Sequence, residues 1–131
     1  MNFNSLLADV VSRINTCNRH RVRTVSLNYN KITLDLVFLL LELGLIRGVK
    51  IRPKNIIWVS LRFKGGFHIF YKLNLISKPS KRIYWNLRNL FLKIDKNNNN
   101  IYIISTKQGL LLGSDCIWRA LTGEVLVKIM L

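Results

Sequence analysis

Residues 101–130 read IYIISTKQGLLLGSDCIWRALTGEVLVKIM, and this stretch decides the fold class of the carboxy-terminal half. Aromatic and β-branched residues predict a strand over Ile101–Ser105. The pattern that follows predicts a short helix over Ser114–Leu121 and a final strand over Val125–Met130. Between the first strand and the helix, Ser105–Gly109 offers hydroxyl groups beside a glycine. Such a turn can bond RNA sugars, bases or phosphates, but by chemistry alone an ordinary serine/threonine turn is the simpler interpretation.

The segment before this stretch opens with a basic, turn-forming loop at Ser77–Lys81. A short strand is expected over Arg82–Trp85. Leu87–Ile94 is largely apolar but contains Arg88 and Lys93, which fits either a short helix or a covering segment. The polar run Asn97–Asn100 predicts a solvated turn. We therefore expect a small, mostly-β unit with one short helix, beginning just before the loop.

In the amino-terminal half, apolar residues recur at three- and four-residue spacing over Asn4–Ile14, which predicts an amphipathic helix capped by Asn4 or Ser5. Alternating basic and apolar residues favour an exposed strand over Arg19–Val25. After a turn at Asn28–Asn30, a second helix is expected over Lys31–Leu43, with Gly44 as its stop.

Strand-like runs follow at Ile46–Ile51 and Ile56–Phe63, separated by a turn at Pro53. Gly65 and Gly66 then break the chain, and Phe67–Leu73 is expected to return as the second arm of a hairpin. The predicted fold class is α+β: an amino-terminal α-β-α-β-β domain over 1–74 and a carboxy-terminal domain over 75–131.

The charge of the chain points to a polyanionic partner. Its 131 residues carry 21 Lys and Arg against 6 Asp and Glu, a net charge of +15, while half of them are apolar. A chain that can bury a core and is this basic favours nucleic acid or an anionic membrane surface. The membrane is disfavoured because the apolar run of residues 36–46 is interrupted by Glu42 and is shorter than the roughly 20 residues of a spanning helix. We expect neither a secretory signal nor a transit peptide at the start.

Catalytic and metal-binding patterns are absent from the sequence. The acidic residues show no paired spacing, and neither histidine has an evident nucleophile beside it. Cys17 and Cys116 are isolated, so a zinc site is disfavoured, and free thiols are a simpler expectation than a disulfide. We expect no enzymatic activity, no metal and no cofactor.

Basic clusters at Arg19–Arg23 and Lys78–Arg82 favour RNA binding over an ordinary solvated surface. Tyr84 and Trp85 follow the second cluster directly. An aromatic ring beside an arginine can stack on an unpaired base, although for Trp85 core packing is an equal expectation.

The order of these segments resembles the family of the eighth protein of the small ribosomal subunit. Ile103–Leu110 followed by Gly123–Leu126 resembles the family's Ser-Thr-Ser-x-Gly and Gly-Gly-Glu signature. Ser77–Tyr84 resembles its Ser-x-Pro-Gly-x-Arg-x-Tyr loop, and Ala8–Ile14 its Ala-Asp-Met-Leu-Thr-Arg-Ile helix. The segment from Asn28 to Lys31 resembles its Pro-Tyr-Ser-Lys helix start. The likeness spans almost the whole chain in the correct order.

Five positions depart from the family pattern. Lys107 replaces a serine, Thr122 replaces the first glycine of Gly-Gly-Glu, and Ser80 replaces the loop glycine. Asn15-Thr16 stands where the family has Arg-Asn. At Lys107 a phosphate contact would replace a hydroxyl contact, so base reading there is put in question while phosphate anchoring is kept.

The resemblance implies a structural constituent of the small ribosomal subunit that binds the central domain of small-subunit rRNA, beside neighbouring ribosomal proteins, and supports assembly and translation. The residues it implies for RNA binding are Arg13, Arg19, Arg21, Arg23, Lys31, Ser77, Lys78, Pro79, Lys81, Arg82, Tyr84, Ser105, Thr106, Lys107, Gly109, Gly123 and Glu124. An RNA-binding regulator or intron-associated factor outside the ribosome is the alternative. The Asn-rich composition favours a mitochondrial ribosome, with plastid and bacterial cytoplasm as the other locations.

Overall fold

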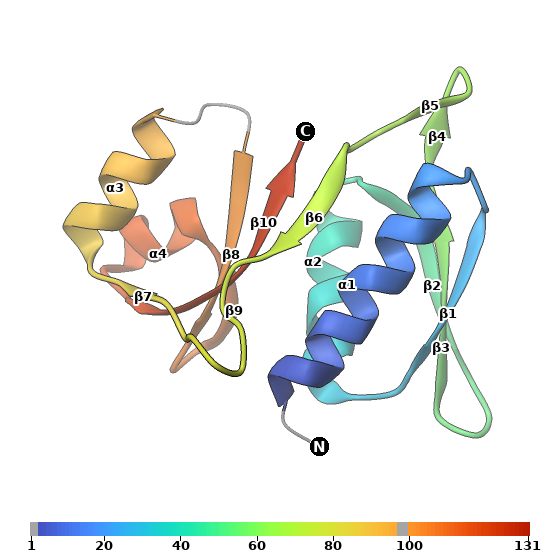
Figure 1. Cartoon of the computed structure of the whole chain (residues 1–131), viewed down its shortest axis with the longest axis horizontal. Coiled ribbons are helices and arrows are strands. Elements are labelled where there is room, and N and C mark those ends of the chain that lie inside the picture. Colours follow the sequence, from blue (N-terminus) through green and yellow to red (C-terminus); the bar gives the residue numbers. More distant parts are fainter. Residues whose placement is uncertain (1–2, 97–99) are drawn as a thin grey trace.

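The computed structural model describes residues 3–96 and 100–131. Within these ranges the chain forms a three-stranded sheet, a five-stranded sheet and a small two-stranded sheet, with two pairs of helices (Figure 1). The elements are α1 (Phe3–Arg19), β1 (Thr24–Asn28), α2 (Lys31–Glu42), β2 (Ile46–Arg52), β3 (Ile56–Leu61), β4 (Phe63–Lys64), β5 (Phe67–His68), β6 (Lys72–Leu75), β7 (Tyr84–Trp85), α3 (Leu87–Lys96), β8 (Asn100–Thr106), β9 (Gly109–Leu112), α4 (Gly113–Arg119) and β10 (Gly123–Met130).

The amino-terminal sheet is antiparallel, in the order β1-β3-β2, and α1 and α2 pack against it. A side-chain cap and a glycine set where α2 begins and ends. The Asn30 side chain accepts a hydrogen bond from the Ile32 amide at 3.1 Å and so caps α2. Gly44 follows the last turn with a φ of +76°, a left-handed conformation that costs glycine little. The second predicted helix is confirmed, ending one residue earlier than expected.

The first helix extends five residues past its predicted end, because polar side chains in its last turns hydrogen-bond to the backbone of another segment. Asn15 donates to the Leu73 carbonyl at 2.7 Å and accepts from the Leu73 amide at 2.8 Å. Asn18 is buried and donates to the Phe70 carbonyl at 2.9 Å. The predicted strand over Arg19–Val25 is therefore wrong in its position: Arg19 ends α1, and β1 starts only at Thr24.

The predicted returning strand over Phe67–Leu73 is also wrong as a single strand. β4 and β5 form a two-residue hairpin around Gly65 and Gly66, and the chain then leaves this hairpin. Phe70, in the segment that crosses from this hairpin to β6, is buried. β6 then joins the other sheet by pairing with β10. The physical reason lies in α1, whose Asn15 and Asn18 hold the backbone of this crossing segment.

The second sheet has the order β6-β10-β8-β9, and β7 pairs with β10 beyond β6. β10 is its centre: Val127–Met130 pairs with β6, and Gly123 and Glu124 pair with β7, with an irregularity between Val125 and Val127 on the β8 side. β9 was not predicted. Leu87–Ile94, left open between helix and covering segment, is part of helix α3. Of the polar run at 97–100, residues 97–99 lie outside the described ranges, and Asn100 begins β8.

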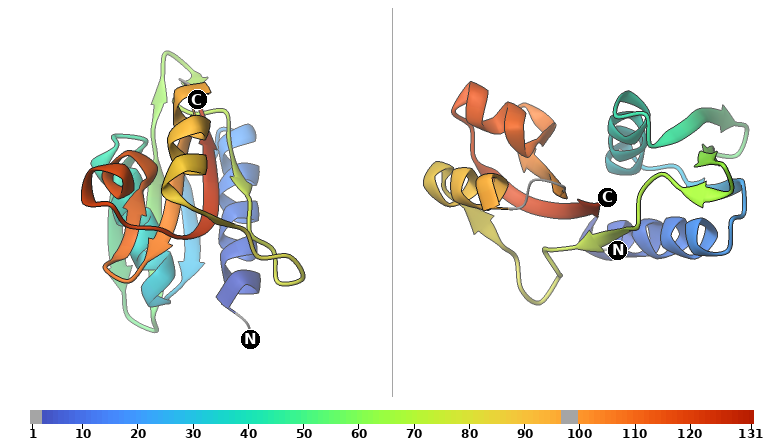
Figure 2. Two further views of the ribbon diagram at one scale, coloured as in Figure 1. Left: turned by 90° about the vertical axis from the view of Figure 1, so that its left-hand side faces the viewer. Right: turned by 90° about the horizontal axis from the view of Figure 1, so that it is seen from above.

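The layers follow from these contacts. α1 lies against β6 and α2 against β9, so the first helix pair packs on both sheets. α3 and α4 cover the opposite side of the second sheet, as Figures 1 and 2 show. A large core cluster accordingly joins both halves, with Leu7 and Ile57 in the same cluster as Ile103 and Val127. The α+β fold class is confirmed. No helix among the described residues is long and apolar enough to cross a membrane.

Candidate RNA-binding surface

The turn between β8 and β9 presents the predicted hydroxyl residues. The Thr106 hydroxyl donates to the Gly109 carbonyl at 2.9 Å and accepts from the Gln108 amide at 3.2 Å. Gly109 has a φ of +104°, which favours glycine. Lys107 is exposed at the tip, while Ser105 and Thr106 are half-buried at its base. Thr106 therefore shapes the turn and Lys107 is free to meet a phosphate.

Three strands bring Ser105, Glu124 and Tyr84 into one row. Glu124 on β10 is opposite Ser105 on β8 and opposite Tyr84 on β7. Glu124 is 8% exposed, so the row has a carboxylate at its centre that is largely removed from water. Gly123 makes the close approach of β10 to β8 feasible, because a Cβ there would collide with the Ser105 carbonyl oxygen.

The basic loop after β6 is held by a buried serine. The Ser77 hydroxyl accepts from the Ile83 amide at 3.0 Å and donates to the Val125 carbonyl, with the side chain fully buried. Lys78 and Lys81 exchange two backbone hydrogen bonds at 3.0 Å, which closes the loop. Its exposed residues are Lys78, Pro79, Ser80, Lys81 and Arg82. Ser77 thus anchors the loop from inside, and the basic side chains face water.

Tyr84 and Trp85 point to opposite sides of β7. Tyr84 is 62% exposed. Trp85 packs edge-on against Tyr102, with ring centroids 5.1 Å apart, and the Lys93 ammonium lies 5.8 Å from the Trp85 ring centre. Of the two aromatics, Tyr84 is the one placed to stack on a base, and Trp85 is a packing residue.

Figure 1 shows the Ser77–Arg82 loop and the β8–β9 turn at the same end of the second sheet. The start of α2 adds Lys31 to this end, because a shallow hollow is lined by Lys31 together with Gln108 and Gly109. The structure therefore gathers most of the predicted residues, including one from the amino-terminal half, on one surface. We call this end, formed by the Ser77–Arg82 loop, Tyr84, the 105–109 turn, Gly123–Glu124 and Lys31, the carboxy-terminal surface.

Four predicted arginines lie apart from the carboxy-terminal surface. Arg13, in the middle of α1, pairs with Asp9 at 3.2 Å and donates to the Ser26 carbonyl at 3.2 Å. Arg19, Arg21 and Arg23 are exposed at the end of α1 and in the connection to β1. Arg19, Arg21 and Arg23 form a separate basic group at the carboxy-terminal end of α1, whereas Lys31 lies toward the other end of that helix.

Three arginines near these surfaces were not predicted. Arg119 on α4 donates to the Gln108 side chain at 3.1 Å and so supports the β8–β9 turn. Arg47 and Arg62 join Arg21 and Arg23 around one hollow. Arg47 lies in β2, Arg62 lies between β3 and β4, and Arg119 ends α4, so none of them belongs to the basic clusters that the sequence singled out.

Two further features bear on chemistry. Both cysteines are free, and burial raises the pKa of the Cys116 thiol, with a further rise from Asp115 and a partial offset from Arg119. Within 3–96 and 100–131 no three His, Cys, Asp or Glu side chains gather as a metal site would require.

The fold and this surface together define an α+β protein whose basic loop, hydroxyl turn and exposed tyrosine are typical of RNA-binding proteins. The family model for Ribosomal protein S8 matches residues 5–130. The chain belongs to the ribosomal protein S8 family.

Curated relatives agree over nearly the full length. The chain is 30% identical over 126 residues to small ribosomal subunit protein uS8 of Mycoplasma mycoides, covering 95% of this chain and 96% of the relative. It is 34% identical over 130 residues to the protein of that name in Neorickettsia sennetsu, covering 94% and 95%. Small ribosomal subunit protein uS8c of Lotus japonicus is 31% identical over 132 residues, with 94% and 96% covered.

Proposed function

We infer that this protein is a structural, non-enzymatic component of the small ribosomal subunit and binds its ribosomal RNA. The observation that carries this inference is the match of the S8 family model to residues 5–130. The net charge of +15 supports it, because Lys and Arg neutralise phosphates and release counterions.

We propose that the RNA segment bound is in the central domain of the small-subunit rRNA, at an irregular, partly unpaired helix. The unit over 75–131 would supply the carboxy-terminal surface, with Tyr84 stacking on an unpaired base and Lys78, Lys81, Arg82 and Lys107 meeting phosphates. The unit over 1–74 would add phosphate contacts from Arg13, Arg19, Arg21, Arg23 and Lys31. Ser77, Gly109, Gly123 and Glu124 would position the contacting groups.

The carboxy-terminal surface is tested by removing two hydroxyls, with Ser105→Ala and Thr106→Ala in one variant. We expect binding to a central-domain RNA fragment to weaken roughly tenfold, since a net hydrogen bond is worth about 0.5–1.5 kcal/mol and Thr106 also holds the turn. A filter-binding titration measures it. Ser12→Ala with Ser114→Ala is the matched control, because both serines are exposed on helices away from the turn. Equal affinity of the two variants would count against this surface.

We propose a mitochondrial ribosome as the location. The support is compositional: the Asn run at 97–100 and the many Asn, Ile and Lys residues fit an A/T-rich organelle gene. Relatives include bacterial and chloroplast forms, so the location needs its own test. An antibody against this chain should detect it in mitochondrial small subunits on a high-salt sucrose gradient. Sedimentation only with plastid or bacterial cytoplasmic subunits would refute the location.

A further inference from the structure

Helix α2 is apolar on nearly all of its sides. From Ile32 to Leu41 only Thr33 and Asp35 are polar. A helix with so many apolar side chains is normally covered all round. The covered face holds the buried residues Thr33, Leu36, Val37 and Leu40. Phe38 is 43% exposed on the opposite face, so this chain covers α2 only in part.

The uncovered face of α2 borders a hollow. Lys31, Asp35, Phe38 and Glu42 follow one another at spacings of four, three and four residues, which places them on one side of the helix. These four residues line a hollow of about 320 Å³ together with Leu39, Gln108, Gly109 and Leu110. The right-hand view of Figure 2 shows α2 at the margin of the molecule. We call this site the α2 hollow.

Two carboxylates flank the exposed ring of Phe38. Asp35 lies three residues before it and Glu42 four residues after it, about one helical turn away on each side. Glu42 is exposed and Asp35 is half-buried. Within residues 3–96 and 100–131 neither carboxylate forms an ion pair, whereas Asp9 pairs with Arg13. Both carboxylates are therefore available to the cations of another molecule.

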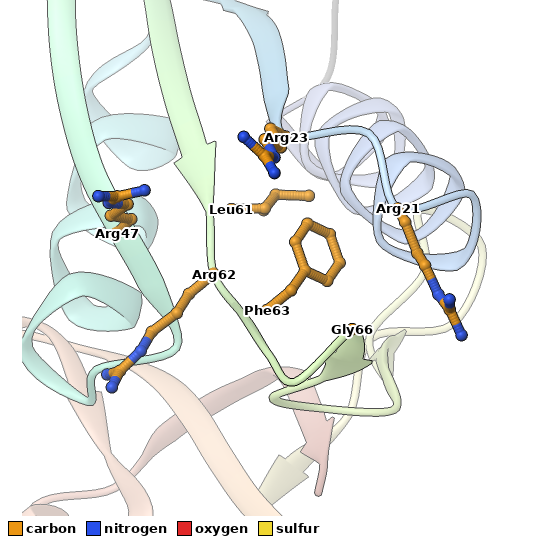
Figure 3. A pocket seen from close by; sticks show the side chains of 7 residues that line it. All are labelled: Arg21, Arg23, Arg47, Leu61, Arg62, Phe63 and Gly66. Carbon is orange, nitrogen blue, oxygen red and sulfur yellow. The ribbon is translucent and has the colours of Figure 1, made fainter.

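The charge of the α2 hollow is opposite to that of the hollow around Arg21, Arg23, Arg47 and Arg62, which Figure 3 shows. No carboxylate is among the described residues that line that second hollow. Carboxylates repel phosphates, so the α2 hollow disfavours both RNA and an anionic membrane. A second copy of the chain is also disfavoured, because two molecules of charge +15 repel each other.

We propose that the α2 hollow docks a basic segment of a neighbouring small-subunit protein. An apolar side chain of that segment would pack on Phe38 and Leu110, and its lysine or arginine side chains would meet Asp35 and Glu42. The apolar contact supplies affinity, and the charges select and orient the partner. This proposal rests on the proposed function, because the partner is a component of the same subunit.

The hollow also adjoins the carboxy-terminal surface. Its Lys31 and Gln108 lie at the start of α2 and in the β8–β9 turn, whereas Glu42 ends α2. The docked segment would therefore lie beside the RNA that the carboxy-terminal surface binds, and one chain would hold RNA and protein next to each other.

The identity of the partner is tested by photo-cross-linking in assembled small subunits. The full chain carries p-benzoylphenylalanine in place of Phe38, and mass spectrometry identifies the peptide that is cross-linked after irradiation. We expect a lysine- or arginine-rich peptide of another small-subunit protein. The same reagent in place of Ile51, which is exposed on β2, is the positional control and should not label that peptide. A cross-link to rRNA, a cross-link to a second copy of this chain, or no cross-link at Phe38 would overturn the proposal.

The contribution of charge is tested in the same cross-linking chain. Asp35→Asn with Glu42→Gln should lower the yield of the protein cross-link roughly fivefold, the scale of two exposed ion pairs. Asp9→Asn with Asp115→Asn removes two exposed carboxylates elsewhere and should change the yield less than about twofold. Equal yields from the two variants would overturn the role of the carboxylates.

The proposed function and the α2 hollow fail separately. Asp35→Asn with Glu42→Gln should leave filter binding to the central-domain RNA fragment within about twofold of the wild type, because neither carboxylate is part of the RNA surface. A chain that enters the small subunit but gives no protein cross-link at Phe38 removes only the docking site. A chain that is absent from small subunits would overturn both.

Discussion

At the scale of single residues, Gly123 sets how closely the strands of the carboxy-terminal surface approach one another. It pairs with Trp85 on β7, and on the other side it lies against the backbone of Ser105 and Thr106. A Cβ there would come within 2.9 Å of the Ser105 carbonyl carbon, and backbone cannot move aside as a flexible side chain can. The row of Ser105, Glu124 and Tyr84 therefore depends on a glycine, which has no side chain, at position 123.

Gly123→Ala should lower the free energy of unfolding by about 1–3 kcal/mol, the usual cost of overpacking. Urea denaturation followed by circular dichroism measures it. Gly48→Ala is the matched control, because Gly48 is also in a strand, has ordinary φ and leaves open space within 4 Å of the position a Cβ would take. We expect that control to change stability by less than about 0.5 kcal/mol. Equal effects at the two glycines would contradict the close approach.

The sequence could identify the hydroxyl turn and the basic loop, because those residues are neighbours along the chain. It could not distinguish residues placed to contact RNA from residues that hold the loop or the turn in place. Ser77 resembles a contact residue in the sequence, yet its hydroxyl is buried and bonded to backbone. Arg47 and Arg62 were missed because only the pairing of β2 with β3 brings them together. The local spacing of residues does not predict which distant strands pair.

At the scale of elements, periodic apolar spacing predicted α2 almost to the residue and α1 only in part. In the last turns of α1, half-buried Asn15 and buried Asn18 hydrogen-bond to the backbone of a segment more than fifty residues away. A buried polar group is favourable only when it is paired. The backbone partner comes within reach only after folding. A prediction from apolar periodicity therefore ends the helix too early.

The short strands were harder to predict for a related reason. β9 follows the hydroxyl turn and pairs along β8 from Thr106 to Ile103. Its sequence Gly109–Leu112 is a run of three leucines after a glycine, which is as suited to a helix as to a strand. Only the positive φ of Gly109 and the adjacent β8 decide for the strand.

At the scale of the whole molecule, the two sheets share a core. Leu7 on α1 belongs to the same cluster as Val25 on β1 and Val127 on β10. A second, smaller cluster around Leu90, Tyr102 and Cys116 lies on the outer side of the second sheet. Because β8 and β10 contribute side chains to both clusters, disruption of the second sheet exposes both clusters.

The buried thiol of Cys116 reports on this coupling. Burial raises its pKa, so in the folded protein less of it is thiolate, the reactive form, than in an ordinary cysteine. Above the ordinary pKa of a thiol, the unfolded chain releases a proton that the folded chain retains. The contribution of Cys116 to the free energy of unfolding is therefore present at neutral pH and falls as the pH rises through that range.

We expect iodoacetamide at pH 8 to modify Cys116 roughly tenfold or more slowly than half-buried Cys17 in the native protein, because the buried thiol reacts only after opening. Mass spectrometry of the two cysteine peptides measures both rates without a variant. In rising urea, modification of Cys116 should accelerate at the same midpoint at which the circular dichroism of the whole chain is lost. Trp58 on β3 supplies a fluorescence signal from the first sheet for comparison when Trp85 and Trp118 are replaced by Phe. Acceleration at Cys116 well below the midpoint of the Trp58 signal would show that the second sheet opens alone, contrary to a core shared by both.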